Sequence, residues 1–304
     1  MNVFVAGGSG TIGVPLVSAL VEAGHQVTAL TRSPNKAGEL RALGASVAVA
    51  DALDRDALVR AVVAAHPTHI IHQLTALPKA GVSRPSDLEP TNRLRIDGTR
   101  NLLDAAVQAG ARRFVVGSFA MLSPRDANPA TAESTDAAAV AIRSMETQVL
   151  DATARGAIEG VILRYGLFYG AGVPSTDDMI DKVRRRKLPV VRHDTGQLPV
   201  INVDDAVSAT VLALDRAPAG AVYEIVDDRP VSLTDIVETI AQYTGASAPR
   251  RVPGWLPRLV APYMARLISM RMPLSNAKAK ADLGWRPKYP TMRDGLAAIV
   301  RRAA

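Results

Sequence analysis

Short apolar runs alternate with longer amphipathic stretches over the first 165 residues. Runs of strand length occupy residues 3–6, 27–31, 46–50, 68–74, 113–117 and 160–164. Between them, apolar residues recur at helical spacing and predict one helix that ends at residue 24 and others over 35–43, 55–65, 91–109 and 137–154. This alternation predicts an α/β fold: a doubly wound parallel sheet of the Rossmann type with right-handed crossovers.

The alternation becomes irregular after Tyr165, and prolines punctuate the later part of the chain. A strand is predicted over 221–226, and helices over 177–187, 233–243, 256–269, 276–283 and 292–302. Residues 200–205 are predicted to lead into a further helix that ends at about residue 215. We interpret residues 1–170 with about 195–228 as a Rossmann domain. Residues about 171–194 with 229–304 are interpreted as a smaller, mostly helical substrate-binding lobe.

The composition is that of a soluble globular protein, with 48% hydrophobic and 21% charged residues among 304. No run of 18 apolar residues occurs, so no membrane span is expected. The first strand follows Met1 directly, so we expect no signal peptide and a cytoplasmic location. The chain has no cysteine, and its five histidines follow no metal-binding pattern, so no metal is expected.

Positive charge is concentrated at the C-terminal end. Residues 249–304 carry a net charge of +10, against +7 for the whole chain, which leaves the first 248 residues at −3. A basic lobe would attract an anionic small-molecule substrate. The alternative is a solvated basic face. Nucleic acid is not an expected partner, because no aromatic side chains interleave with the basic ones and no docking motif is present.

A glycine-rich turn, Gly7-Gly8-Ser9-Gly10-Thr11-Ile12-Gly13, joins the first predicted strand to the first helix. Gly7 permits the tight turn, Gly10 lets the backbone approach a pyrophosphate, and Gly13 lets the helix pack closely on the sheet. The N-terminus of the helix then offers free N–H groups to phosphates. The turn therefore predicts a dinucleotide site whose contacts are Gly7, Ser9, Gly10, Thr11, Ile12 and Gly13.

The second predicted strand ends in Thr31-Arg32-Ser33, and Lys36 follows closely. Chains that bind NAD usually carry Asp or Glu near this point, which holds the ribose 2′-hydroxyl. A guanidinium instead pairs with a 2′-phosphate, which a carboxylate would repel. We therefore predict NADP(H) rather than NAD(H), with Thr31, Arg32 and Ser33 as contacts. The alternative is that Arg32 is a loop charge only.

The spacing Gly7, Gly10, Gly13 resembles the loop of the short-chain dehydrogenase/reductase superfamily, and the fuller resemblance is to its extended branch, the NAD-dependent epimerase/dehydratase family. Residues 97–103 resemble the G-T-x-N-L-L helix of that family, and residues 114–118 resemble its strand that delivers a catalytic Ser or Thr. Later matches at 163–170, 201–205, 223–225 and 283–287 extend the resemblance over residues 2–295.

The resemblance implies further cofactor contacts. Asp51, with Ala52 beside it, matches an acid that contacts adenine, although Asp51 or Asp54 could instead cap the next helix. The cofactor riboses are expected against Leu74, Thr75 and Ala76, whereas His72 is interpreted as a packed strand residue. Arg95, where the family commonly has Asn, and Ser118, which matches the catalytic hydroxyl, complete the implied set.

The chain departs from the family at the catalytic Tyr-x-x-x-Lys pair. No tyrosine precedes Tyr165, and the helix predicted over 137–154 contains no lysine. The remaining candidates for the acid are Ser118, Tyr165 and Tyr169, with Arg143 or Arg164 as the cation that would lower a tyrosine pKa. The alternative is that Tyr165 and Tyr169 only pack the hinge between the lobes, which is the favoured interpretation for Tyr169.

Three functions are compatible with these residues. We predict an atypical extended oxidoreductase that uses NADP(H) on a small carbonyl, alcohol or sugar-type substrate. The alternatives are a non-catalytic sensor similar to the NmrA-like proteins and a non-redox isomerase, cyclase or epimerase on the same scaffold. The resemblance also implies a possible homodimer through the helices over 91–109 and 137–154.

Overall fold

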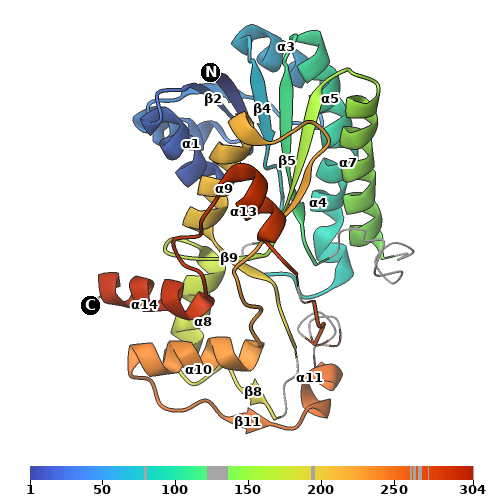
Figure 1. Cartoon of the computed structure of the whole chain (residues 1–304). Coiled ribbons are helices and arrows are strands. Elements are labelled where there is room, and N and C mark those ends of the chain that lie inside the picture. The colour runs from blue at the N-terminus through green and yellow to red at the C-terminus, as the bar shows by residue number, and fades with distance from the viewer. Residues whose placement is uncertain are drawn as a thin grey trace.

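The computed structural model describes residues 1–78, 81–121, 136–192, 196–260, 262, 265, 269–272 and 274–303. Its central sheet has seven parallel strands in the order β10-β6-β5-β4-β1-β2-β3 (Figure 1). The strands are β1 (Asn2–Ala6), β2 (Gln26–Thr31), β3 (Ser46–Val49), β4 (His69–His72), β5 (Arg113–Phe119), β6 (Glu159–Tyr165) and β10 (Val222–Ile225). This order confirms the predicted doubly wound fold and places a crevice where it reverses, at the carboxyl ends of β1 and β4.

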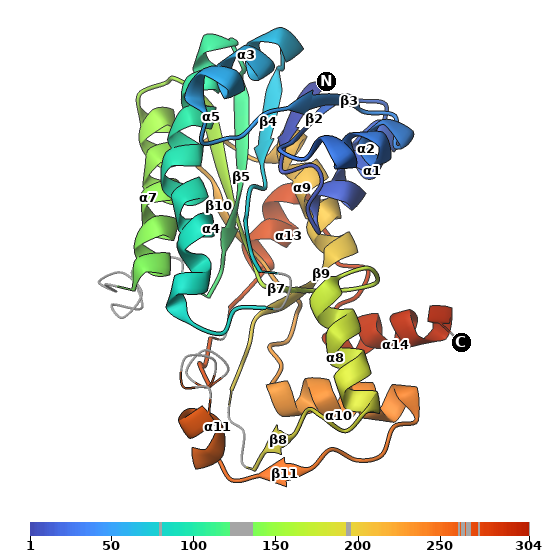
Figure 2. The same cartoon turned by 180° about the vertical axis from the view of Figure 1, so that it is seen from behind.

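Helices cover both faces of the sheet, and each face has its own apolar core (Figure 2). One core contains Val3 and Val115, and the other contains their neighbours Phe4 and Phe114. Because both faces are buried, the strands have the near-continuous apolar sequences from which they were predicted. The covering helices are α1 (Gly13–Glu22) and α9 (Val203–Arg216) on one face, and α3 (Arg55–Ala65), α5 (Thr99–Gln108) and α7 (Ala137–Ala154) on the other. A short helix, α2 (Ala37–Ala42), connects β2 to β3.

The helix predicted over 91–109 is one helical stretch whose winding changes along its length. It comprises α4 (Glu89–Arg93), a π-helical turn (Leu94–Gly98) and α5. Apolar spacing predicted the helix but not the π turn, because one widened turn hardly disturbs the periodicity. Such turns are often found at functional sites, and this one carries Arg95.

A smaller lobe lies beyond the carboxyl ends of the strands (Figure 1). A third apolar core, with residues such as Val183, Ile240 and Leu296, joins its helices. The sequence did not predict its short paired strands, since two or three residues show no usable period. Of the helix predicted over 256–269, residues 256–260 are helical, and most of 261–268 lie outside the described residues. The elements are α8 (Pro174–Arg184), α10 (Leu233–Thr244), α11 (Trp255–Val260), α14 (Met292–Ala303), and the pairs β7 (Leu167–Tyr169) with β9 (Val200–Asn202) and β8 (Val190–Val191) with β11 (Arg251–Val252).

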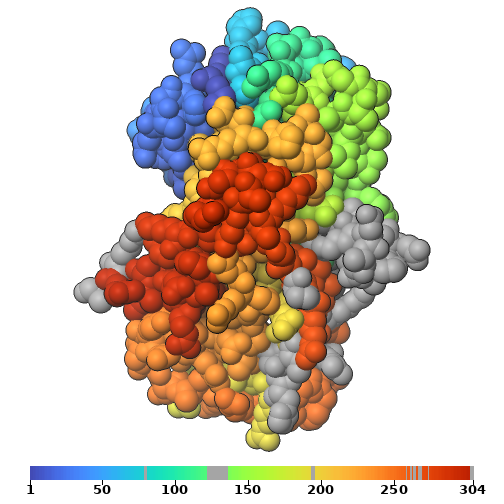
Figure 3. Space-filling model, viewed as in Figure 1, coloured from blue at the N-terminus to red at the C-terminus, as the bar shows by residue number. Residues whose placement is uncertain are grey.

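The C-terminal segment returns to the sheet before it ends in the lobe. Residues of helix α13 (Ala277–Leu283) and the fully buried Trp285 belong to the same core as α9 and β10. The C-terminal segment, in red, lies across the front of the molecule in Figure 3. Helix α14 then packs on α10 of the lobe. The division of the chain into two domains stays a prediction, and the packing of α13 on the sheet is an exception to it.

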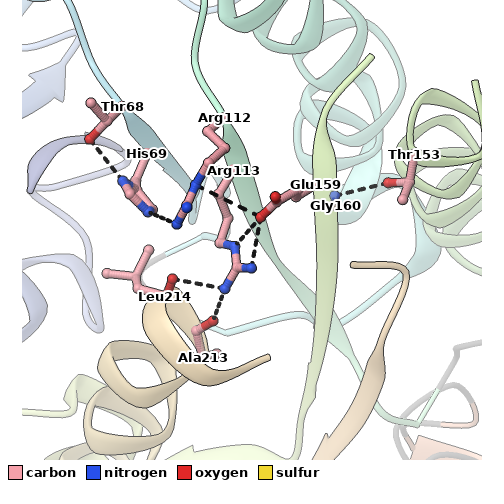
Figure 4. A network of polar contacts seen from close by, with 9 residues as sticks. All are labelled: Thr68, His69, Arg112, Arg113, Thr153, Glu159, Gly160, Ala213 and Leu214. Atoms are coloured by element: carbon pink, nitrogen blue, oxygen red, sulfur yellow. Dashed lines mark hydrogen bonds and ion pairs between the residues drawn. The ribbon is translucent and has the colours of Figure 1, made fainter. Parts of the chain in front are cut away.

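Ion pairs and hydrogen bonds fasten the amino end of the sheet (Figure 4). The buried Arg113 donates to Glu159 Oε2 at 2.7 Å and to the carbonyls of Ala213 and Leu214 at the end of α9. In an open α/β sheet, ligands bind beyond the carboxyl ends of the strands, which is the opposite end from these contacts. In the described part of the chain, no helix is both long and apolar enough to cross a membrane.

Candidate functional site

The glycine turn has the geometry of a phosphate-binding loop. Gly7 has a φ of +91°, and a Cβ there would lie 2.6 Å from the carbonyl oxygen of Gln73. A Cβ on Gly13 would collide with the Gly7 carbonyl oxygen. Gly10 is exposed and meets only that same oxygen, at 3.3 Å from a built Cβ. The turn is therefore compact within the protein and open toward solvent at Gly10, which fits a pyrophosphate.

The end of β2 lies against this turn. Ser9 Oγ and Thr31 Oγ1 are 3.1 Å apart, and the Ser33 N–H donates to Thr31 Oγ1 at 3.2 Å. Lys36 Nζ donates to the Ser9 carbonyl at 3.0 Å, and Arg32 is exposed beside them. Two hydroxyls and the Lys36 ammonium thus lie together at the end of β2, and the exposed Arg32 follows Thr31 directly.

The two aspartates that follow β3, Asp51 and Asp54, have different roles, which the sequence alone left open. Asp54 is the N-cap of α3 and accepts from the Ala57 N–H at 3.0 Å. Asp51 instead accepts from the Leu53 N–H at 2.9 Å, within the loop that follows the strand. Ala52 is buried below it. Asp54 is therefore the cap, and Asp51 is an exposed residue of the loop.

The segment after β4 is held by the long helix. His72 Nε2 lies 2.9 Å from Thr99 Oγ1, and Thr91 Oγ1 accepts from the Ala76 N–H at 2.9 Å. Residues 74–76, the predicted ribose contacts, are thus fixed between these two threonines. His72 is buried, as predicted, and desolvation, with a contribution from nearby Arg95, lowers its pKa to about 4. It is a neutral packing residue at pH 7.

Ser118, at the end of β5, belongs to a buried polar network that the sequence did not predict. Its hydroxyl donates to Glu146 Oε1 of α7 at 2.6 Å. Arg164 of β6 donates to both oxygens of Glu146, at 3.0 and 2.6 Å, and to Glu224 at 3.4 Å. The available signal was an acid in the buried stripe of α7, which is otherwise apolar.

The buried stripe of α7 has apolar residues where the family carries its catalytic Tyr and Lys. The residues of α7 that face the interior before Glu146 are Ala138, Ala139, Ala141, Ile142 and Met145. The resemblance places the Tyr and Lys on this helix, and here its inner face is apolar until Glu146. Arg143 is only half-buried.

Tyr165 lies on the opposite face of the sheet from Ser118. Its hydroxyl is 2.7 Å from Thr210 Oγ1 of α9, and Gln73 Nε2 donates to it at 3.0 Å. Burial raises the pKa of this phenol to about 12. The side chain packs between the sheet and α9, so the structure does not bring it together with Ser118.

Tyr169 joins the Rossmann part to the lobe. Its hydroxyl donates to Asp227 Oδ2 at 2.9 Å and lies 3.3 Å from the Thr291 carbonyl oxygen, just before α14. Gly295 of α14 packs directly on its ring. Burial and the neighbouring Asp227 raise the pKa of Tyr169 well above its usual value. These contacts favour the hinge interpretation, and the roles of Ser118, Tyr165 and Tyr169 in catalysis stay predictions.

Known proteins resemble this chain over nearly its whole length. A 3-diazoavenalumate denitrifying reductase from a Streptomyces species is 37% identical, covering 97% of this chain and 99% of its own. A 4-hydroxy-2-methyl-3-oxo-4-farnesyl-3,4-dihydroquinoline-1-oxide ketoreductase from Stigmatella aurantiaca is 30% identical over 82% of this chain and 75% of its own. Among solved structures, the UDP-glucose 4-epimerase of Thermus thermophilus in complex with NAD superposes with a TM-score of 0.76, at 25% identity and full coverage of both chains.

The family model of the NAD-dependent epimerase/dehydratase family matches residues 3–226, which include the glycine turn, β5 with Ser118, and β6. The match agrees with the sheet order, the glycine geometry and the full-length relatives. The chain therefore belongs to the NAD-dependent epimerase/dehydratase family.

Proposed function

We propose that this protein is an NADP(H)-dependent reductase that transfers hydride to a small anionic substrate. The observation that carries the proposal is the meeting of the open glycine turn with Thr31, Arg32 and Lys36 on one rim of the crevice. Two full-length or near full-length relatives are named as reductases, which supports the reaction class. The excess of cations in residues 249–304 supports an anionic substrate.

When bound, the cofactor supplies the hydride, and the chain supplies binding and orientation. The N–H groups of the turn and of the first turn of α1 would hold the pyrophosphate. Arg32 and Lys36 would hold a 2′-phosphate, and Asp51 would accept from the adenine amine. Residues 74–76 would contact the riboses.

A carbonyl substrate would also need a proton. Ser118 is the candidate whose strand end faces the α7 side of the sheet, and in the structure its hydroxyl donates to Glu146. The hydroxyls of Tyr165 and Tyr169 lie instead on the α9 side of the sheet and at the contact with the lobe. Among the three predicted acids, we therefore propose Ser118 as the group that orients a carbonyl, which requires its hydroxyl to turn from Glu146 toward the substrate.

A substrate that needs no acid is a second candidate. The Streptomyces relative is named as a denitrifying reductase of a diazo-bearing carboxylate. Hydride addition to a diazonium carbon forms a C–H bond as the C–N bond breaks and N₂ leaves, so no oxyanion develops and no proton is required. The apolar inner face of α7 before Glu146 favours this class, because it offers no titratable group.

The test is to follow NADPH oxidation with a panel of ketones and of diazonium carboxylates. The wild type is compared with Ser118→Ala, Tyr165→Phe and Tyr169→Phe. Ketone turnover that falls ~10²-fold or more in Ser118→Ala supports the first candidate, and N₂ release that survives in all three variants supports the second. Tight NADPH binding with no turnover of either class would instead favour the sensor or a non-redox enzyme.

A further inference from the structure

Three residues at a spacing of four lie along one side of the long helix: Thr91, Arg95 and Thr99. Thr99 contacts His72 at the end of β4, and Thr91 binds the Ala76 N–H four residues further on. Arg95 lies between them on the helix. Its side chain is therefore on the side of the helix that lies along residues 72–76.

The π turn accounts for this alignment. In an α-helix with 3.6 residues per turn, residues four apart drift steadily around the axis. A π turn contains more residues than an α turn and so reduces that drift. Because Leu94–Gly98 is wound this way, Arg95 stays in line with Thr91 and Thr99.

Arg95 is 9% exposed, and its guanidinium donates to Asn92 Oδ1 at 3.4 Å. Its charge reaches β4, because it is one of the two causes that lower the pKa of His72. The segment beside it, residues 74–76, is the one proposed to lie along the cofactor riboses.

We propose that Arg95 holds the nicotinamide ribose of the bound cofactor, in place of the lysine that is missing from α7. This inference rests on the proposed function. A guanidinium has five N–H donors and stays charged at every physiological pH, so it can donate to both ribose hydroxyls as the lysine of the family does. The cation has thus moved from α7 to the helix that packs beside it.

The first measurement tests whether the charge of Arg95 lies near His72 of β4. In Arg95→Gln the hydrogen-bonding length is nearly kept and the charge is lost, so the pKa of His72, followed by NMR, is expected to rise. Arg100→Gln is the matched control, because Arg100 is an exposed arginine of the same helix paired with Asp97. If the pKa of His72 is unchanged in Arg95→Gln, the charge of Arg95 does not lie near β4, and the proposal is overturned.

The second measurement compares the affinity for the whole cofactor with the affinity for its adenosine half. Calorimetry compares NADPH with adenosine 2′,5′-bisphosphate, which lacks the nicotinamide ribose. Arg95→Gln is expected to weaken NADPH roughly 10- to 100-fold, the range for a charge-assisted hydrogen bond, and to leave the bisphosphate within about twofold. Arg95→Lys should recover part of the loss, and Arg32→Ala should weaken both ligands.

Two results would overturn the proposal while the proposed function stands: NADPH binding unchanged in Arg95→Gln, or equal losses for both ligands, which would make Arg95 a structural residue. Failure of the wild type to bind NADPH at all would overturn both.

Discussion

Single side chains at the end of β2 are proposed to select NADP(H) over NAD(H). Arg32 is exposed next to a Ser9–Thr31 hydroxyl pair, and Lys36 fastens the loop to the Ser9 carbonyl. Arg32→Ala should weaken NADP(H) binding by ~1.5–3 kcal/mol, the range for a charge-assisted hydrogen bond, and leave NAD(H) almost unaffected. Calorimetry with both cofactors measures this, and tighter binding of NAD(H) than NADP(H) by the wild type would contradict the assignment.

Gly10 is a second decisive position. Its backbone N–H bonds to the Gly7 carbonyl, and its Cα faces the open side of the turn. Gly10→Val should abolish binding of both cofactors, because a side chain there prevents the backbone from approaching a pyrophosphate. The protein should stay folded, since the glycine has an ordinary φ and only one near contact. Gly38→Val, at an exposed glycine with no neighbour within 4 Å, is the control. Unchanged affinity in Gly10→Val would make the turn purely structural.

At the scale of elements, Arg113 joins β5, β6 and α9 at the amino end of the sheet. Its side chain is 8% exposed, whereas that of the neighbouring Arg112, which also reaches Glu159, is 61% exposed. Arg113→Met should destabilise the protein by about 2–4 kcal/mol, because it leaves the carbonyls that end α9 and part of Glu159 without a donor. Arg112→Met should cost less than about 1 kcal/mol.

Urea unfolding measures this difference, and NADPH affinity provides the second readout. The affinity should not change in Arg113→Met, because the site lies at the other end of the strands. Equal destabilisation by the two substitutions would contradict the role of Arg113.

Much of the element order could be predicted, because each strand and helix is encoded by a local pattern. The glycine turn and the run Thr31-Arg32-Ser33 are each encoded by a short contiguous segment. Each segment follows one of two successive predicted strands, so their meeting was predictable. Glu146 and Arg164 are 18 residues apart on different elements, and their pairing depends on how α7 packs on β6. Tyr169 and Asp227 are 58 residues apart, and the π turn around Arg95 leaves the helical period intact. Contacts of this kind are set by tertiary packing rather than by local sequence.

At the scale of the whole molecule, the contact between Tyr169 and Asp227, which joins the Rossmann part to the lobe, makes the stability of the protein depend on pH. Asp227 is 3% exposed, and its Oδ1 has no hydrogen-bond partner among the described residues. Burial raises its pKa to about 8, and the nearby Asp205 adds to the rise. The folded protein therefore holds a proton at pH 7 that the unfolded chain, with an ordinary carboxyl near ~3.9, has released.

The contribution of Asp227 to stability should consequently be fully present below about pH 4, fall as the pH rises from ~4 to ~8, and be lost above that, with a total effect on the order of a few kcal/mol. Asp227→Asn should remove this part of the dependence, since the amide stays neutral. The urea midpoint at pH 5 and at pH 8.5 measures it. Asp205, whose pKa burial also raises, is present in both proteins, so their difference isolates Asp227. An identical pH slope in both would contradict the role of Asp227.

The return of the C-terminal segment to the sheet has a consequence for synthesis on the ribosome. The core shared by α1, α9 and β10 also needs Leu283 and Trp285, which are made long after α1. A nascent chain therefore cannot close that core until translation has passed Trp285. The two tryptophans can report the event, because Trp285 is fully buried and Trp255 is 61% exposed. With Trp255 replaced by Phe, the emission of Trp285 would time the moment at which this later segment completes the core around α1.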